Sequence, residues 1–418
     1  MPRVWVVVLG DVGRSPRMLY HTRSLCESGF QVDLVGQQGS PIVQELQPHV
    51  QSGQLKLRYL PELPPLAAKI PVRALRLAFK ALYQLVTMAW LTWVALPRPD
   101  HILLQIPPAI PTMMVLRAAA LLRRARLVFD WHNFGFTIMA LSLGERHWLV
   151  NIAERYEKRW APTAAAHLCV SRAMASELRD GWGVHARVLH DRPNDAFARA
   201  TPADLHALVL RHRAALQSSL HVEDWLAAAA QTQDKERPLP RVVFLITGKG
   251  ANKAAYEALL RRCRFRHVAF RLLWLPMADY RLLLGCADLG VCLHASSSGV
   301  DLPMKVVDMF GAGLPVLAAD YPAITELVLP ERNGLLFSSP ETLAGHLVAL
   351  LRGGEASGMS AALRALRDGA ALEARRDWRA EWLAVAKPLF EPDDVPAQAE
   401  KVEVAAPKKE SLPKRRRK

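Results

Sequence analysis

Two series of short apolar runs, each interrupted by helical stretches, restrict the fold more than any other feature of this chain. In the first series the candidate strands are Val4–Leu9, Phe30–Val35, Leu55–Tyr59, His101–Gln105, Leu127–Phe129 and His167–Val170. The second series begins near Arg241 and comprises Val242–Ile246, Phe270–Trp274, Leu289–Leu293 and Pro315–Ala318. Strands that alternate with helices form doubly wound parallel sheets. We therefore predict an α/β protein with two Rossmann-like domains.

Composition divides the 418 residues into four parts. Residues 1–192 form the first predicted domain and 241–390 the second. Between them, 193–240 is rich in alanine, histidine and charge and lacks clear strands, so we interpret it as a hinge and a poorly defined start of the second domain. Residues 391–418 are rich in Pro, Ala, Glu and Lys and end in KRRRK, a composition that cannot bury a core, and we predict a disordered tail. The net charge is +15, but the strongest basic run lies in this tail without interleaved aromatics, which argues against nucleic-acid binding.

One segment, Ala74–Leu96, is unusually apolar and has only Arg76 and Lys80 as charged residues. It falls short of the ~20 apolar residues that span a bilayer. It is compatible with a buried core helix, or with an interfacial helix whose Trp90 and Trp93 lie at headgroup level. We favour contact with a membrane surface. The apolar N-terminal run is also too short for a signal peptide or a spanning helix, and is expected to be the first strand.

A glycine turn, Gly10-Asp11-Val12-Gly13-Arg14, follows the first strand, and Ser15 with Pro16 is expected to start a helix that ends near Gly29. Gly13 and Arg14, together with Arg17, suit a phosphate at a helix start, although the turn is not a full dinucleotide fingerprint. Asp11 is either a turn-capping residue or a functional carboxylate. A second candidate loop, Asp130-Trp131-His132-Asn133-Phe134, also follows a strand, where ligands commonly bind. The alternative interpretation is that this loop only fills the interior with aromatic side chains and a hydrogen-bonded histidine.

The most specific pattern runs from Leu293 to Val316: LHASSSGVDLPMKVVDMFGAGLPV. The Ser296-Ser297-Ser298-Gly299 loop and the helix start near Lys305 predict a cradle for a diphosphate. Asp308, nearly one turn further along, is placed to accept hydrogen bonds from ribose hydroxyls. Lys305 is alternatively an exposed lysine at a helix start. Gly248-Lys249-Gly250, after the first strong strand of the second domain, is a weaker nucleotide-side candidate.

No site for a tightly bound metal is predicted. The five cysteines form no C-x-x-C pair and indicate buried thiols in a reducing compartment. No Asp-x-Asp motif or His/Cys ligand set is present.

These motifs resemble a known family. The pattern P-x-K-x-x-x-D-M-F-G-x-G-x-P is similar to the nucleotide-sugar site of GT-B glycosyltransferases. In these enzymes two Rossmann-like domains face each other across a cleft. The usual acid in the motif is Glu, where this chain has Asp308. A narrower resemblance is to the chitobiosyldiphosphodolichol β-mannosyltransferases. It rests on five segments: VVVLGDVGRSPRM, DWHNFGF, ERYEKRW, ITGKG and ADLGVCLHASSSGVDLPMKVVDMFGAGLPV. The likeness covers most of residues 3–390.

The resemblance implies transfer of mannose from GDP-mannose to GlcNAc₂-diphosphodolichol with a β1,4 link, at the cytosolic face of the endoplasmic reticulum membrane, by a peripheral or monotopic protein. It implies no tightly bound cofactor, a lipid-linked acceptor, and other mannosyltransferases of the pathway as partners. An inverting transfer needs a base. Asp11, just after the first strand, is the preferred candidate and His132 the second, with Asp130 and Asn133 near the phosphate or acceptor.

A rival hypothesis is a catalytically impaired scaffold subunit of the same assembly. It rests on the segment from Leu216 to Ala230, where the family has a Ser/Trp/acid-rich loop and this chain keeps only Ser218-Ser219 and Glu223-Asp224-Trp225.

Overall fold

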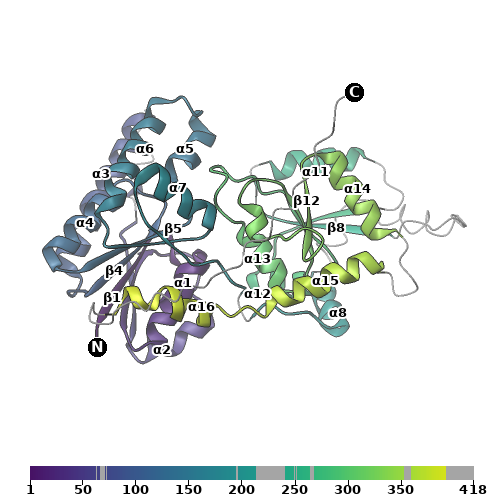
Figure 1. Cartoon of the computed structure of the whole chain (residues 1–418), viewed down its shortest axis with the longest axis horizontal. Helices are drawn as coiled ribbons and strands as arrows, with labels where there is room; N and C mark the ends of the chain where they lie inside the picture. The colour runs from purple at the N-terminus through teal and green to yellow at the C-terminus, as the bar shows by residue number, and fades with distance from the viewer. Residues whose placement is uncertain are drawn as a thin grey trace, which may run out of the picture.

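Two α/β units lie side by side in the computed structural model of the chain (Figure 1). It describes residues 1–62, 64–65, 71, 73–193, 196–212, 241–248, 250, 252–263, 268–352 and 359–391. The segment on which the scaffold hypothesis rests and Lys249 lie outside these residues, as does all of the predicted tail after 391.

The first unit is built on a seven-stranded parallel sheet in the order β3-β2-β1-β4-β5-β6-β7. Its strands are β1 (Arg3–Asp11), β2 (Gln31–Gln37), β3 (Leu55–Tyr59), β4 (His101–Ile106), β5 (Arg126–Trp131), β6 (Ala166–Cys169) and β7 (Arg187–Val188). All but the two-residue β7 overlap the predicted runs. Because the strand order reverses between β1 and β4, the loops after these strands border a crevice where α/β proteins bind ligands.

Helices cover both faces of this sheet. They are α1 (Pro16–Glu27), α2 (Gln47–Gln51), α3 (Arg73–Trp90), α4 (Thr112–Arg123), α5 (Gly135–Leu143), α6 (Trp148–Trp160) and α7 (Arg172–Trp182). Alternate residues of β1 belong to different core layers: Trp5 packs in the layer that contains α4 residues, and Val6 in the layer that contains α1 residues. The α1 helix begins at Pro16 as predicted, but Ser15 makes no side-chain cap; its hydroxyl donates to Gln105 instead, at 2.9 Å.

The second unit contains two groups of parallel strands. β8 (Val242–Thr247) pairs with β9 (Val268–Leu273), and β10 (Gly290–Cys292), β11 (Val316–Ala319) and β12 (Gly334–Phe337) form a three-stranded sheet. The accompanying helices are α8 (Pro202–Arg211), α11 (Lys253–Arg262), α12 (Met277–Cys286), α13 (Met304–Gly311), α14 (Pro340–Leu351) and α15 (Ala361–Ala374). The prediction of two Rossmann-like α/β units is therefore confirmed, although β12 was not predicted.

The last helix, α16 (Trp378–Val385), returns to the first unit, where Figure 1 shows it beside α1. Trp382 is fully buried, and its indole Nε1 donates to His21 Nδ1 at 2.9 Å. Trp378 Nε1 donates to Ser24 Oγ at 3.0 Å. The sequence assigned this segment to the second domain, whereas the structure packs it into the core layer of the first.

The apolar segment of the sequence analysis forms α3 and a following turn of π-helix, η4 (Leu91–Ala95). One side packs into the core through Met88 and Leu91, whereas Trp90 and Val94 on the other side are more than half exposed. The core interpretation is confirmed for one side of the segment, whereas membrane contact through the exposed side stays a prediction. Within the described ranges, no helix has the length and apolarity needed to cross a membrane.

Candidate active site

A buried ionic cluster lies where β5 ends. The Arg17 guanidinium donates to both carboxylate oxygens of Asp130 at 2.8 Å and to Asp191 at 3.0 Å. Arg17 and Asp130 are both at most 2% exposed. The same guanidinium also donates to the carbonyl of Leu189 at 2.7 Å. Because Arg17 is buried and its donors are used by these groups, its predicted use as a phosphate ligand is wrong.

His132 completes a carboxylate–imidazole pair in this cluster. Its Nε2 lies 2.8 Å from Asp130 Oδ2. Burial alone would raise the pKa of Asp130, but the charge of Arg17 and the hydrogen bonds from His132 and His21 hold it well below its usual range. A carboxylate only accepts hydrogen bonds, so Nε2 carries the proton, and Nδ1 of the neutral ring is left as an acceptor. His21, the third neighbour, is buried, which lowers its pKa.

Asp11 is held by its own loop. One or both of its carboxylate oxygens accept from Gly13 N at 3.0 Å, from Ser40 N at 2.8 Å and from Ser40 Oγ at 2.8 Å. Arg14 is a further partner, at 3.6 Å. Although burial opposes it, these contacts lower the pKa of Asp11. A Cβ at Gly13 would lie 2.3 Å from Ser40 O, so this glycine is required for the close approach of the two loops.

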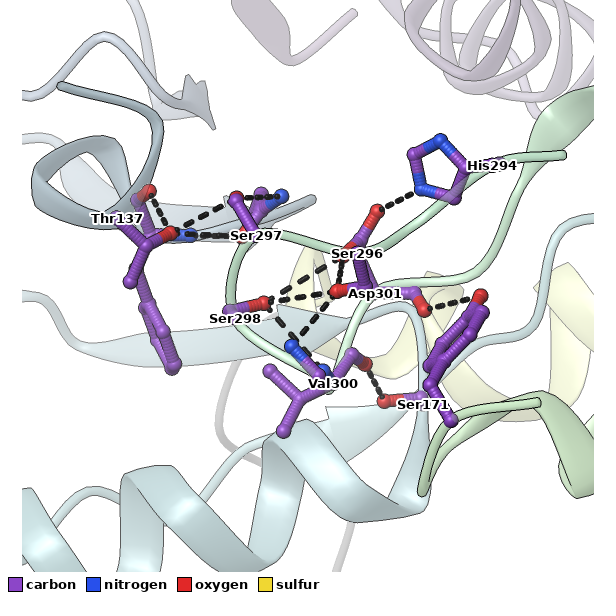
Figure 2. Close-up of polar contacts among 12 residues, drawn as sticks. Thr137, Ser171, His294, Ser296, Ser297, Ser298, Val300 and Asp301 are labelled. Carbon is purple, nitrogen blue, oxygen red and sulfur yellow. Dashed lines mark hydrogen bonds and ion pairs between the residues drawn. The ribbon is translucent and has the colours of Figure 1, made fainter. Parts of the chain in front are cut away.

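Asp301 organises the predicted donor loop (Figure 2). Its carboxylate accepts from Ser296 Oγ, and from Ser298 Oγ at 3.4 Å, and lies 3.1 Å from His294 Nε2. Gly299 has a φ of +76° and donates its N–H to Ser296 Oγ at 2.7 Å. Burial raises the pKa of Asp301 but the His294 and Ser296 hydrogen bonds outweigh it, so the net shift is downward. Two of the predicted donor serines therefore shape the loop.

Ser297 joins the two units, as Figure 2 shows. Asn133 Nδ2 donates to Ser297 Oγ at 3.3 Å, and Thr137 Oγ1 lies 3.0 Å from the same hydroxyl. Ser171 Oγ donates to the carbonyl of Val300. The loop that follows β5 and the loop that follows β10 are therefore in direct contact, and His132 is the neighbour in sequence of Asn133, which touches the predicted donor loop.

A second contact between the units involves Glu326. It accepts from the N–H groups of Arg172 and Ala173 at 2.7 and 2.8 Å, at the start of α7. Its carboxylate also lies 3.1 Å from His190 Nε2, in the segment that follows β7.

The remaining predicted donor residues differ in their surroundings. The side chain of Asp308, on α13, makes no hydrogen bond within the described residues, and burial raises its pKa to about 7. Lys305 is exposed at the start of the same helix. Gly248 and Gly250 follow β8. Ligand contacts of these residues stay predictions.

A metal site was not predicted from the sequence. The described part of the chain holds no group of three or more His, Cys, Asp or Glu side chains placed to bind a metal ion.

Two family models match this chain, and each covers one of its two units. The family described as "Glycosyl transferase 4-like domain" matches residues 13–195, and "Glycosyl transferases group 1" matches 216–353. The chain is 38% identical to "UDP-glycosyltransferase TURAN" from Arabidopsis thaliana over 93% of this chain and 97% of that protein. It is 35% identical to the "Chitobiosyldiphosphodolichol beta-mannosyltransferase" of Yarrowia lipolytica over 93% of this chain and 86% of that one. Proteins from several other organisms bear this second name.

The chain belongs to the chitobiosyldiphosphodolichol β-mannosyltransferase family. The resemblance stated from the motifs is thereby confirmed. The fold is also that of solved glycosyltransferases: a sucrose-phosphate synthase from Thermosynechococcus elongatus superposes with a TM-score of 0.61 over 92% of this chain and 97% of that one, at 15% identity.

No role was predicted from the sequence for three residues of the candidate site: Asp191, Asp301 and Glu326. Asp191 and Glu326 are far along the chain from the residues that they contact, and Asp301 binds its own loop through side-chain contacts that spacing alone does not show. The Ser-x-Ser-x-x-Asp spacing of 296–301 was the only available signal, because serine hydroxyls commonly bond a nearby carboxylate in tight loops.

Proposed function

We propose that the chain transfers mannose from GDP-mannose to the terminal GlcNAc of chitobiosyldiphosphodolichol and forms a β1,4 link with inversion. The observation that carries the proposal is the near full-length similarity to proteins of that name. The protein is a glycosyltransferase of the GT-B fold, with a nucleotide sugar as donor and no tightly bound cofactor.

His132 is the base that the geometry favours over Asp11. Its Nδ1 accepts the proton of the acceptor hydroxyl, and the oxygen then attacks the anomeric carbon as the bond to GDP breaks. Asp130 stabilises the imidazolium that forms, and Arg17 keeps Asp130 ionised. Asp11 has several hydrogen-bond donors on its carboxylate and a lowered pKa, both of which weaken it as a proton acceptor.

Departure of GDP is assisted by the second unit. The start of α13, which follows the loop shaped by Asp301, faces the diphosphate, while Lys305 supplies a positive charge and Asp308 binds the ribose. The acceptor lipid lies in a membrane of the endoplasmic reticulum, which the protein contacts peripherally from the cytosolic side. Other mannosyltransferases of the same assembly are expected partners.

The test is a transfer assay with purified protein, radiolabelled GDP-mannose and a chitobiosyldiphosphate lipid. We expect a trisaccharide-lipid whose label is released by β-mannosidase. UDP-glucose serves as the competing donor, since the Arabidopsis thaliana relative is named a UDP-glycosyltransferase. Transfer from the uridine donor alone would contradict the assignment of the donor, and a folded protein that binds GDP but transfers nothing would support the scaffold hypothesis.

A further inference from the structure

A path of buried polar contacts connects the last helix, α16, with the proposed base. Trp382 of α16 donates its indole Nε1 proton to Nδ1 of His21 on α1, at 2.9 Å. The other ring nitrogen of His21, Nε2, lies 3.3 Å from Asp130 Oδ2. The same carboxylate oxygen lies 2.8 Å from His132 Nε2. A helix that follows the whole second unit in sequence is thus linked, through His21 and Asp130, to the histidine of the transfer reaction.

The first contact of this path determines the tautomer of His21. An indole N–H only donates, so Nδ1 of His21 must accept and carries no proton. His21 and Trp382 are fully buried, and burial lowers the pKa of His21, so its ring is neutral. A neutral imidazole without a proton on Nδ1 carries it on Nε2. The nitrogen that bears the proton is therefore the one that lies next to Asp130.

Asp130 shares its negative charge among groups from several elements. Arg17 of α1 donates to both of its oxygens, and Asp191 accepts from the same guanidinium. His21 and His132 both lie against Oδ2. Because they share one acceptor, loss of the donor at His21 leaves more negative charge for His132. That charge favours the protonated ring of His132, and a protonated ring cannot act as a base.

The other tryptophan of α16 has a different hydrogen-bond partner. Trp378, one turn earlier on the helix, donates its indole N–H to Ser24 Oγ at 3.0 Å. This hydrogen bond does not reach Asp130. The Trp378 ring also packs edge-on against His21, with the ring centroids 5.3 Å apart, and a phenylalanine would keep a ring there. The two tryptophans therefore allow the same substitution to be made on the path and beside it.

We propose that Trp382 and His21 are positioning residues for the transfer reaction: the indole keeps the proton of His21 on Nε2, and this N–H shares the Asp130 carboxylate with His132. No proton moves along the path, which only limits how strongly Asp130 attracts the ring of the base. The inference rests on the proposed function, because that function makes His132 the base.

The test measures kcat/KM for mannose transfer against pH, because its acidic limb reports protonation of the base in the free enzyme. His21→Leu removes the donor to Asp130, and the acidic limb should move to higher pH by about half a unit to one unit, the effect of one hydrogen bond. His21→Gln should restore much of the wild-type profile, since its amide offers both an acceptor and donors. GDP affinity should be unchanged in both variants.

Trp382→Phe tests the start of the path and keeps an aromatic ring in the core. Its acidic limb should also move to higher pH. Trp378→Phe is the matched control, because it loses an indole hydrogen bond from the same helix, and its profile should stay within about 0.2 unit of wild type. Thermal unfolding establishes which variants are folded. An unshifted limb in folded Trp382→Phe would overturn the inference, as would an equal shift in Trp378→Phe, which would indicate only a general loosening of α16.

Histidine-selective ¹⁵N NMR of the full chain tests the same path without mannose transfer. His21 should carry its proton on Nε2, and the titration of His132, identified by its absence in His132→Ala, should move to higher pH in Trp382→Phe. A wild-type protein with both properties that transfers no mannose would contradict the proposed function alone. A proton on Nδ1 of His21, or an unchanged titration of His132 in the variant, would overturn the inference whatever the transfer activity.

Discussion

Asp130 determines what the groups around it can do. It accepts hydrogen bonds from an arginine and holds the histidine that follows it in the loop by two residues. The same carboxylate thus fixes the tautomer of His132 and neutralises a buried guanidinium. Arg17 and Asp130 are 113 residues apart, and Asp11 and Ser40 are 29 apart, so local spacing could not show either partnership.

Replacement of the base is the first prediction. His132→Ala should lower kcat by about 10²–10⁴, the usual contribution of a general base, with GDP affinity unchanged. Steady-state transfer and calorimetry measure the two effects, and His185→Ala, at an exposed histidine, is the control.

Asp11→Asn should lower thermal stability more than turnover, because it disturbs the bonds to Gly13 and Ser40. Normal turnover in His132→Ala with a large loss in Asp11→Asn would assign the base to Asp11.

Asp308 should make GDP binding depend on pH. Burial raises its pKa to about 7, so the carboxyl becomes ionised as the pH rises through neutrality. The ionised form is the stronger acceptor for ribose hydroxyls, and GDP affinity should increase several-fold between pH 6 and pH 8. Calorimetric titration across this range should give a much flatter profile for Asp308→Asn. An identical pH profile in wild type and variant would exclude Asp308 from the ribose site.

At the scale of elements, most strands were predictable from the sequence, although β7 and β12 were not. The contacts that hold the ends of helices were not predictable either. Continuous β-branched runs identify buried strands because both faces are covered. The start of α5 shows the contrary case: Glu157 of α6 accepts hydrogen bonds from Gly135 N and Phe136 N at 3.2 Å, and burial raises its pKa to about 8. Such a cap supplied by another helix leaves no local sequence signal.

The exposed side of α3 and η4 carries the next prediction. Trp90→Asp combined with Val94→Asp should release the protein from liposomes, because both side chains are more than half exposed and contribute to the apolar surface. Sedimentation with vesicles measures binding. Leu91 is unsuitable for this test since it is buried, and an aspartate there would damage the core. Unchanged sedimentation of a folded double variant would contradict membrane contact through this element.

For the whole molecule, the return of α16 links the stability of the first unit to the end of the chain. Trp382→Ala should destabilise that unit by about 3–5 kcal/mol, the typical cost of removing a large buried aromatic side chain. Urea unfolding measures the loss of stability, and hydrogen exchange would locate that loss beside α1. Leu383→Ala, partly exposed on the same helix, is the control and should cost much less. Equal effects of the two substitutions would show that the buried indole is not what fixes the helix.

The topology of α16 also has a consequence for synthesis of the protein. A domain at the start of a chain ordinarily folds on the ribosome before later domains emerge. Here Trp382 and Phe390 belong to a core layer of the first unit, and both are translated after the whole of the second unit. The first unit must therefore wait, with an uncovered apolar strip along α1, until nearly four hundred residues have been made. During that interval the nascent chain offers this strip to chaperones.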